Sequence, residues 1–139
     1  MTDLNSTERK IFESVKTIGF VGLSPKKEKT SNSIGRYLIK KGFTVYPVYP
    51  GDQENILGLR VYRSLRDIQP VPDMILLFVN KARADSFADD ILLVKPKALW
   101  LPEGVESKSL QKLAYENDIL FIMDRCIYKE HVKYLKSLE

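Results

Sequence analysis

Five short apolar runs recur along the chain, and the segments between them carry apolar residues at helical spacing. The run DMILLFV at 73–79 is the most apolar, which predicts a central strand covered on both faces. The segment 33–41 has the period of a helix, and Gly42 supplies its C-terminal stop. We therefore expect strands at 17–22, 43–48, 73–79, 97–101 and 119–123, and helices at 33–41, 82–93 and 107–116.

Both ends of the chain also carry helix signals. Asn5 and Glu8 form a capping-box pattern, a short polar side chain followed three positions later by a glutamate, and predict a helix through about Val15. The stretch 51–72 is punctuated by glycine and proline and is expected to be irregular, with a helical turn at 64–68. We predict one domain over 1–139, with an N-terminal helical segment at 1–15 and a C-terminal helix at 129–139.

The alternation of strands and helices predicts the fold class. Strands that alternate with helices form parallel sheets through right-handed crossovers, with helices on both faces. We expect an α/β, Rossmann-like, doubly wound five-stranded parallel sheet in three layers. Such sheets bind ligands outside the carboxyl ends of their strands, near the point where the strand order reverses. The loops after Val21, Val48, Val79, Leu101 and Met123 are therefore the candidate site loops.

Composition narrows the class of protein further. The 139 residues carry a formal charge of +4, with a pI near 9.1, which favours anionic ligands. The basic residues are spread along the chain and the aromatic residues are not clustered, so we expect no nucleic-acid partner. No run approaches the ~20 apolar residues that cross a bilayer, so we expect no membrane partner. With Cys126 as its one cysteine and no apolar leader, the chain is expected to be cytoplasmic.

The loop after the first predicted strand has the features of a phosphate cradle. Gly22 lets a ligand approach the backbone, three lysines follow it, and Ser31 or Asn32 can cap the helix whose first amides point at an anion. An ordinary capped helix behind a solvated basic loop is the alternative. The loop departs from the dinucleotide pattern G-x-G-x-x-G, because the next glycine after Gly22 is Gly35, inside the helix.

The end of the second predicted strand disfavours an NAD site. Such a site has an acidic residue there for the ribose hydroxyls, whereas this chain has Val48, Tyr49 and Pro50, with Asp52 as a late substitute. Val48 and Pro50 suit the flat face of an adenine. The alternative for the prolines is a strand exit and a turn.

The last two strand ends carry further candidates. Pro102 and Glu103 follow the fourth strand in a turn that places a carboxylate at a strand end, as binding sites often do. Trp100 lies in the strand itself and is expected in the core or an interface. After the fifth strand, Asp124 and Arg125 could orient each other, and a nearby cation would make Cys126 a reactive thiol; a buried structural thiol is the alternative.

His131 is expected to be a solvated residue of a surface helix. With one histidine and one cysteine, we expect no metal site and no catalytic dyad.

Taken together, residues 17–128 resemble the small bacterial CoA-binding domain proteins, which are related to the N-terminal CoA-binding domains of the succinyl-CoA synthetase alpha subunit and of NDP-forming acyl-CoA synthetases. The segments that carry the resemblance are IGFVGLSPKKEKTSNSIGRYLIKKGFTVYPVYPG, ILGLRVYRSLRDI, PDMILLFV, ALWLPEGV and MDRC. The resemblance implies that the first loop wraps the phosphates, the second strand end flanks the adenine, and the third and fourth line the rest of the cofactor. The implied cofactor-binding residues are Gly22, Leu23, Ser24, Lys29, Ser31, Asn32, Val48, Tyr49, Pro50, Phe78, Val79, Asn80, Pro102 and Glu103.

The resemblance implies a module that binds coenzyme A or an acyl-CoA and has no independent catalysis. Related synthetases transfer a phosphoryl group through a histidine on another domain, and this chain has no room for that domain. The departures from the family are Tyr49 in place of asparagine, Gly51 in place of lysine, and Pro102-Glu103 where many small members have glutamine. The alternative is an NAD(P)-binding oxidoreductase or redox sensor. We expect a monomer or a homodimer, and an unidentified protein partner is left open.

Overall fold

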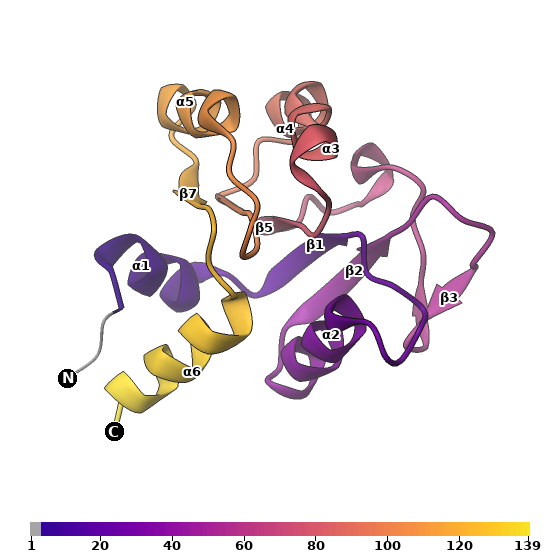
Figure 1. Ribbon diagram of the computed structural model, residues 1–139, viewed down its shortest axis with the longest axis horizontal. Helices are drawn as coiled ribbons and strands as arrows, with labels where there is room; N and C mark the ends of the chain where they lie inside the picture. Colours follow the sequence, from indigo (N-terminus) through magenta and orange to yellow (C-terminus); the bar gives the residue numbers. More distant parts are fainter. Residues whose placement is uncertain (1–3) are drawn as a thin grey trace.

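Five parallel strands form the central sheet of the protein, in the order β2-β1-β5-β6-β7 (Figure 1). The computed structural model describes residues 4–139. The predicted five-stranded parallel sheet and its Rossmann-like α/β fold are confirmed. The strands are β1 (Thr17–Val21), β2 (Thr44–Val48), β5 (Met74–Leu77), β6 (Ala98–Trp100) and β7 (Leu120–Ile122).

Helices cover both faces of the sheet and complete three layers. In Figure 1, α1, α2 and α6 lie on one side of the strands and α3, α4 and α5 on the other. The helices are α1 (Ser6–Ser14), α2 (Thr30–Lys40), α3 (Lys81–Asp85), α4 (Ala88–Val94), α5 (Lys108–Glu116) and α6 (Ile127–Ser137), with a 3-10 turn η1 (Leu65–Asp67) and a small hairpin of β3 (Asn55–Ile56) and β4 (Leu59–Arg60).

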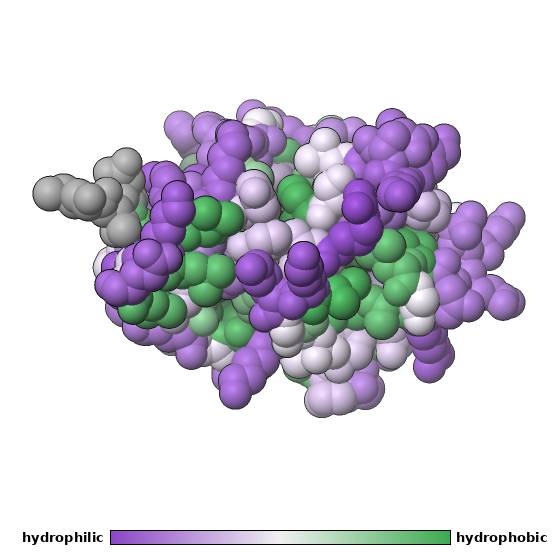
Figure 2. Space-filling model, turned by 90° about the horizontal axis from the view of Figure 1, so that it is seen from below, coloured by the Kyte–Doolittle hydropathy of each residue, from purple (hydrophilic) through white to green (hydrophobic). Residues whose placement is uncertain are grey.

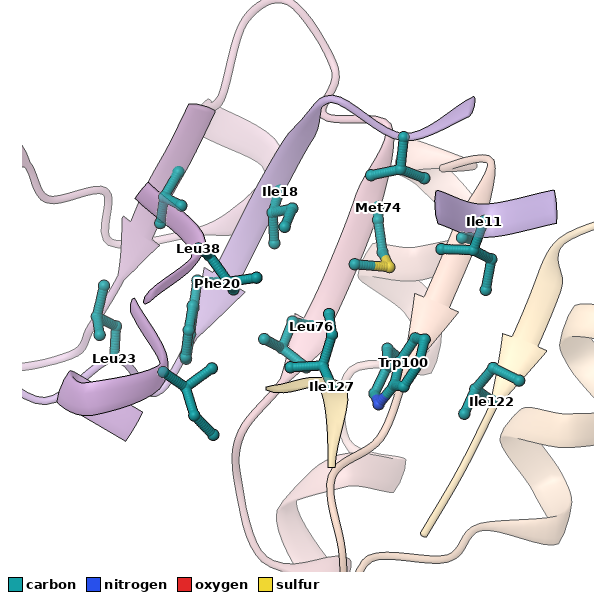
Figure 3. Close-up of a cluster of buried hydrophobic side chains, with 14 of the residues drawn as sticks. Ile11, Ile18, Phe20, Leu23, Leu38, Met74, Leu76, Trp100, Ile122 and Ile127 are labelled. Carbon is teal, nitrogen blue, oxygen red and sulfur yellow. The ribbon is translucent and has the colours of Figure 1, made fainter. Parts of the chain in front are cut away.

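Alternation along the strands divides the core into two halves. Because successive side chains of a strand point to opposite faces, Phe20 and Leu76 pack with α2 and α6, while Ile75 and Leu77 pack with the helices of the other face. Figure 3 shows the first half, with Trp100 among aliphatic side chains. Trp100 is fully buried, as expected, and its indole Nε1 donates a hydrogen bond to the Arg125 carbonyl at 2.8 Å. Both faces of the central strand β5 are therefore covered.

Several predicted boundaries differ from the structure. The capping box at Asn5 and Glu8 is present and opens α1. Helix α2 begins three residues before the predicted start, the predicted helix at 82–93 is the pair α3 and α4, and α6 begins at Ile127. The predicted turn at 64–68 is η1, capped by the side chain of Ser64, whereas the hairpin in the stretch expected to be irregular was not predicted. No helix among residues 4–139 is long and apolar enough to span a bilayer.

The prediction that His131 is solvated is wrong. Its side chain is buried between α6, α1 and α2, with ring-edge contacts to Phe12 and Phe43. Its Nδ1 lies 2.8 Å from the Tyr37 hydroxyl. Burial lowers the pKa of His131, and Lys41 lowers it further. The histidine is thus a packed, hydrogen-bonded core residue.

Candidate functional site

A cavity of about 520 Å³ opens at the carboxyl ends of β2, β1 and β5. This is where the strand order reverses: the connection after β1 leads to β2 on one side, and the chain returns to β5 on the other. Nine predicted residues border the cavity: Gly22, Ser24, Lys29, Ser31, Tyr49, Pro50, Phe78, Val79 and Asn80.

Gly22 makes the floor of this cavity. Its φ of +87° is in the region that favours glycine, and a Cβ at this position would lie 2.1 Å from the Phe78 carbonyl oxygen. Its amide donates to the Val48 carbonyl at 2.9 Å, so the residue joins the ends of β1 and β2. Only glycine allows the three strand ends to converge this closely.

The loop between β1 and α2 is held by side chains of α2. Ser31 Oγ accepts a hydrogen bond from the Ser24 amide at 3.0 Å, and Asn32 Nδ2 donates to the Ser24 carbonyl at 2.8 Å. Arg36 Nε in turn donates to Asn32 Oδ1 at 2.9 Å. Ser31 and Asn32 are both buried. The loop conformation is therefore preorganised by α2 rather than left to solvent.

The first turn of α2 presents its amides to the cavity without a side-chain cap. Lys29 is the N-cap residue, and within residues 4–139 no side chain accepts a hydrogen bond at this helix start. Lys29, Thr30 and Ser31 all border the cavity, and Arg83 of α3 borders it as well. Free amides at a helix start favour anions, as do the two cations. The cavity therefore has groups that could hold a phosphate, and the phosphate cradle stays a prediction.

Three predicted site residues lie behind the cavity instead of on its surface. Leu23 is fully buried in one half of the core, and Val48 is 5% exposed in the other. Asn32 is 2% exposed and holds the loop as described above. These three residues support the walls of the cavity from the protein interior. Val48 is the buried last residue of β2, Leu23 packs into the core directly after Gly22, and Asn32 lies on the buried side of α2.

A second cavity, of about 250 Å³, continues from the first. Thr30 and Phe78 border both cavities, so the two meet at the end of β5. The predicted pair Pro102 and Glu103 borders this second cavity with Cys126. The cleft thus runs across the sheet edge from the end of β2 to the loop after β7.

The loop after β7 does not form the predicted Asp124–Arg125 pair. Asp124 Oδ1 accepts a hydrogen bond from the Gly104 amide at 2.8 Å, which fixes the turn after β6. The Arg125 guanidinium lies instead 3.7 Å from Glu8 Oε1 and 3.5 Å from Glu130 Oε1. Cys126 is half-buried and is the N-cap residue of α6.

Glu8 and Glu130 form a buried carboxyl pair beside this loop. The Glu8 side chain is fully buried, and this burial, together with the neighbouring Glu130 carboxyl, raises the pKa of Glu8 to about 7. The Glu130 carboxyl is also held by Lys133 Nζ at 3.3 Å. The raised pKa leaves part of the Glu8 population protonated at neutral pH, which reduces the repulsion between the two carboxyl groups.

Sequence reasoning missed several residues of the cleft. Val21, Thr30 and Arg83 border the first cavity, and Ile34 and Ile127 border the second. Thr30 belongs to the helix turn that was predicted as loop. Arg83 lies one turn into a helix after β5, so its approach to the loop after β1 depends on sheet order, which the sequence pattern does not give.

The chain is similar to known proteins over most of its length. A family model described as CoA binding domain matches residues 16–132. The uncharacterized protein YneT of Bacillus subtilis (strain 168) is 26% identical over 123 residues, which are 88% of this chain and 90% of that protein. The solved structure of a hypothetical protein from Pyrococcus horikoshii OT3 matches with a TM-score of 0.86 and 30% identity, covering 92% of this chain and 89% of that one.

A larger protein contains a domain of similar fold. The dinucleotide-forming acetyl-coenzyme A synthetase 1 of Ca. Korarchaeum cryptofilum, solved with phosphate and ADP, matches with a TM-score of 0.71 at 19% identity. The match covers 85% of this chain but 28% of the synthetase. At this identity, the likeness is one of fold.

Proposed function

The chain belongs to the CoA binding domain family, and from that premise we propose that it binds coenzyme A or an acyl-CoA along the carboxyl edge of its sheet. We assign the diphosphate to the first turn of α2, with Lys29 and Arg83 as its cations. The adenine is assigned to Tyr49 and Pro50 at the end of β2. The pantetheine arm would then pass Phe78, and the sulfur end would lie near Cys126.

The observation that carries this proposal is the continuity of the two cavities. They share Thr30 and Phe78, and together they extend from the end of β2 to the loop after β7. Neighbouring strands lie ~4.8 Å apart, so four spacings span roughly 19 Å. A cleft this long suits an extended ligand with a phosphate group near one end and an arm that reaches past β5.

We further propose that the chain acts as a binding module without catalysis of its own. No histidine, carboxylate or cysteine is among the described residues that border the first cavity, and its amides, hydroxyl groups, two cations and apolar surface are suited to binding. The function would then depend on whether the cofactor is bound. An NAD(P) ligand is disfavoured, because Asp52 is exposed and is not among the residues described around the cavity.

A ligand panel tests this proposal. Coenzyme A, 3′-dephospho-CoA, acetyl-CoA, NAD and NADP are compared by thermal shift and by isothermal titration calorimetry. At a hundredfold excess over Kd, a ligand that binds only the folded protein stabilises it by ~2.7 kcal/mol. We expect this response for coenzyme A and acetyl-CoA. A response to NAD or NADP without one to coenzyme A would support the oxidoreductase alternative, and equal responses to all five would contradict selective binding.

A further inference from the structure

A third cavity, of about 230 Å³, lies between α2 and α6. It is bordered by Thr30, Ile34, Tyr37, Cys126 and Tyr128, with Ser33 at its rim. Thr30, Ile34 and Cys126 also border the second cavity, so the third is continuous with the end of the cleft assigned to the cofactor sulfur. Figure 2 views the molecule from the side of α2 and α6, and hydrophobic areas lie there between hydrophilic ones.

The walls of the third cavity are aliphatic and aromatic. Ile34 is 6% exposed and packs into the core, so it forms a fixed apolar surface. The rings of Tyr37 and Tyr128 meet edge to face, with centroids 4.7 Å apart and an interplanar angle of 82°. The Tyr37 hydroxyl is directed to His131, which holds this ring in place. The two tyrosines therefore limit the cavity at the side away from the cleft.

A fourth cavity, of about 400 Å³, meets the same end of the cleft and has the opposite character. It shares Glu103 and Cys126 with the second cavity. Its border is charged, and its carboxylates outnumber its cations: Glu103, Glu106, Asp124 and Glu130 against Arg125 and Lys129. This surface disfavours both an apolar chain, which gains nothing from a charged wall, and an acidic group, which it repels.

Resting on the proposed function, we propose that the third cavity receives the acyl chain of a short, uncharged acyl-CoA. The sulfur end of the cofactor would reach Cys126, where the apolar and charged cavities part, and the acyl chain would enter the side bordered by Ile34, Tyr37 and Tyr128. The third cavity would then favour acyl groups according to the apolar surface that they bury in it. Acyl groups with a terminal carboxylate, such as succinyl, are discriminated against by both branches.

The first test compares ligands on the unaltered protein. Isothermal titration calorimetry gives Kd for coenzyme A, acetyl-CoA, butyryl-CoA and succinyl-CoA. Each methylene that enters an apolar site strengthens binding roughly fourfold. We expect butyryl-CoA, which has two methylenes more than acetyl-CoA, to bind roughly sixteenfold more tightly than acetyl-CoA, and succinyl-CoA to bind more weakly than butyryl-CoA. Equal affinities, or tighter binding of succinyl-CoA, would overturn the acyl cavity.

The second test places a charge in the cavity. Tyr128 is 45% exposed, so Tyr128→Asp is compatible with folding, and it should bring the affinity ratio of butyryl-CoA to coenzyme A close to one. Tyr115→Asp is the matched control, because Tyr115 is 86% exposed on α5 on the other face of the sheet, and the ratio should stay at its original value. An unchanged ratio in Tyr128→Asp overturns the inference. If neither compound binds the unaltered protein, the proposed function itself fails, which is a separate outcome.

Discussion

The backbone of Gly22 lies against the carbonyl oxygen of Phe78 so closely that a Cβ on Gly22 would be 2.1 Å from it. We predict that Gly22→Ala lowers the free energy of unfolding by about 2 to 4 kcal/mol, through a strained φ and a backbone clash. Urea denaturation measures the change. Affinity for coenzyme A should fall with it, because the floor of the first cavity must move.

Gly42 provides the control for this substitution. Its φ of +98° is also unfavourable for alanine, but a Cβ there meets nothing within 4 Å. Gly42→Ala should therefore cost only about 1 kcal/mol and leave binding unchanged. Equal losses for the two variants would show that the contact with Phe78 does not matter.

Arg83 is expected to contribute directly to binding. It borders the first cavity opposite α2, and a charge-assisted hydrogen bond to phosphate is worth ~1.5 to 3 kcal/mol. We predict that Arg83→Ala weakens binding of coenzyme A by roughly ten- to a hundredfold in calorimetry. Lys81→Ala is the matched control, because Lys81 is a cation of the same helix that is not among the described residues of the cavity. A similar loss in both variants would indicate a general effect of charge.

Glu8 should make the protein less stable as the pH rises. Its pKa is about 7 in the folded protein, against the ordinary 4.5 in the unfolded chain. The folded state thus holds more protons between these values, so the free energy of unfolding falls with rising pH, by about 3 kcal/mol over the range. In Glu8→Gln this fall should be absent, as measured by urea denaturation from pH 4.5 to pH 8. Glu13→Gln, an exposed glutamate on the same helix, should keep the original profile.

His131 should have the opposite dependence. Because its pKa is lowered by burial, the unfolded chain takes up the proton first as the pH falls through 6.5, and stability falls with it. The two effects oppose each other in the unaltered protein, so we predict that Glu8→Gln alone becomes more stable as the pH rises from 5 towards 7. Adding His131→Gln should flatten the profile. A double variant that still gains stability over this range would assign the effect to another group.

The order of strands and helices could be predicted because short apolar runs and helical periods are local properties of the sequence. The boundaries that were missed depend on less regular chemistry. The polar first turn of α2 carries no apolar period, so Thr30 reads as loop. The break between α3 and α4 falls at Ser86 and Phe87, within a pattern that is periodic on both sides. The β3–β4 turn places Leu57 at a φ of 54°, a conformation that leucine rarely adopts.

The candidate site could be predicted as a set of strand ends but not as a surface. A residue that directly follows a predicted strand must lie near the carboxyl edge of the sheet. This rule was enough to predict that Tyr49, Ser31 and Asn80 lie near one another, and all three border one cavity. The same rule does not predict whether a side chain points outward, so the burial of Val48 behind the cavity was not predicted. His131 was misjudged for a related reason: its neighbours Phe12 and Phe43 come from segments far away in the sequence.

Cys126 borders the second, third and fourth cavities and is the sole cysteine of the chain. A trifluoromethyl label attached to its sulfur would therefore need no engineered attachment site. Its ¹⁹F resonance would sense which branch of the cleft an added compound enters, since one branch is aromatic and the other ionic. The natural sequence thus provides an attachment site for a spectroscopic label where the apolar and charged cavities meet.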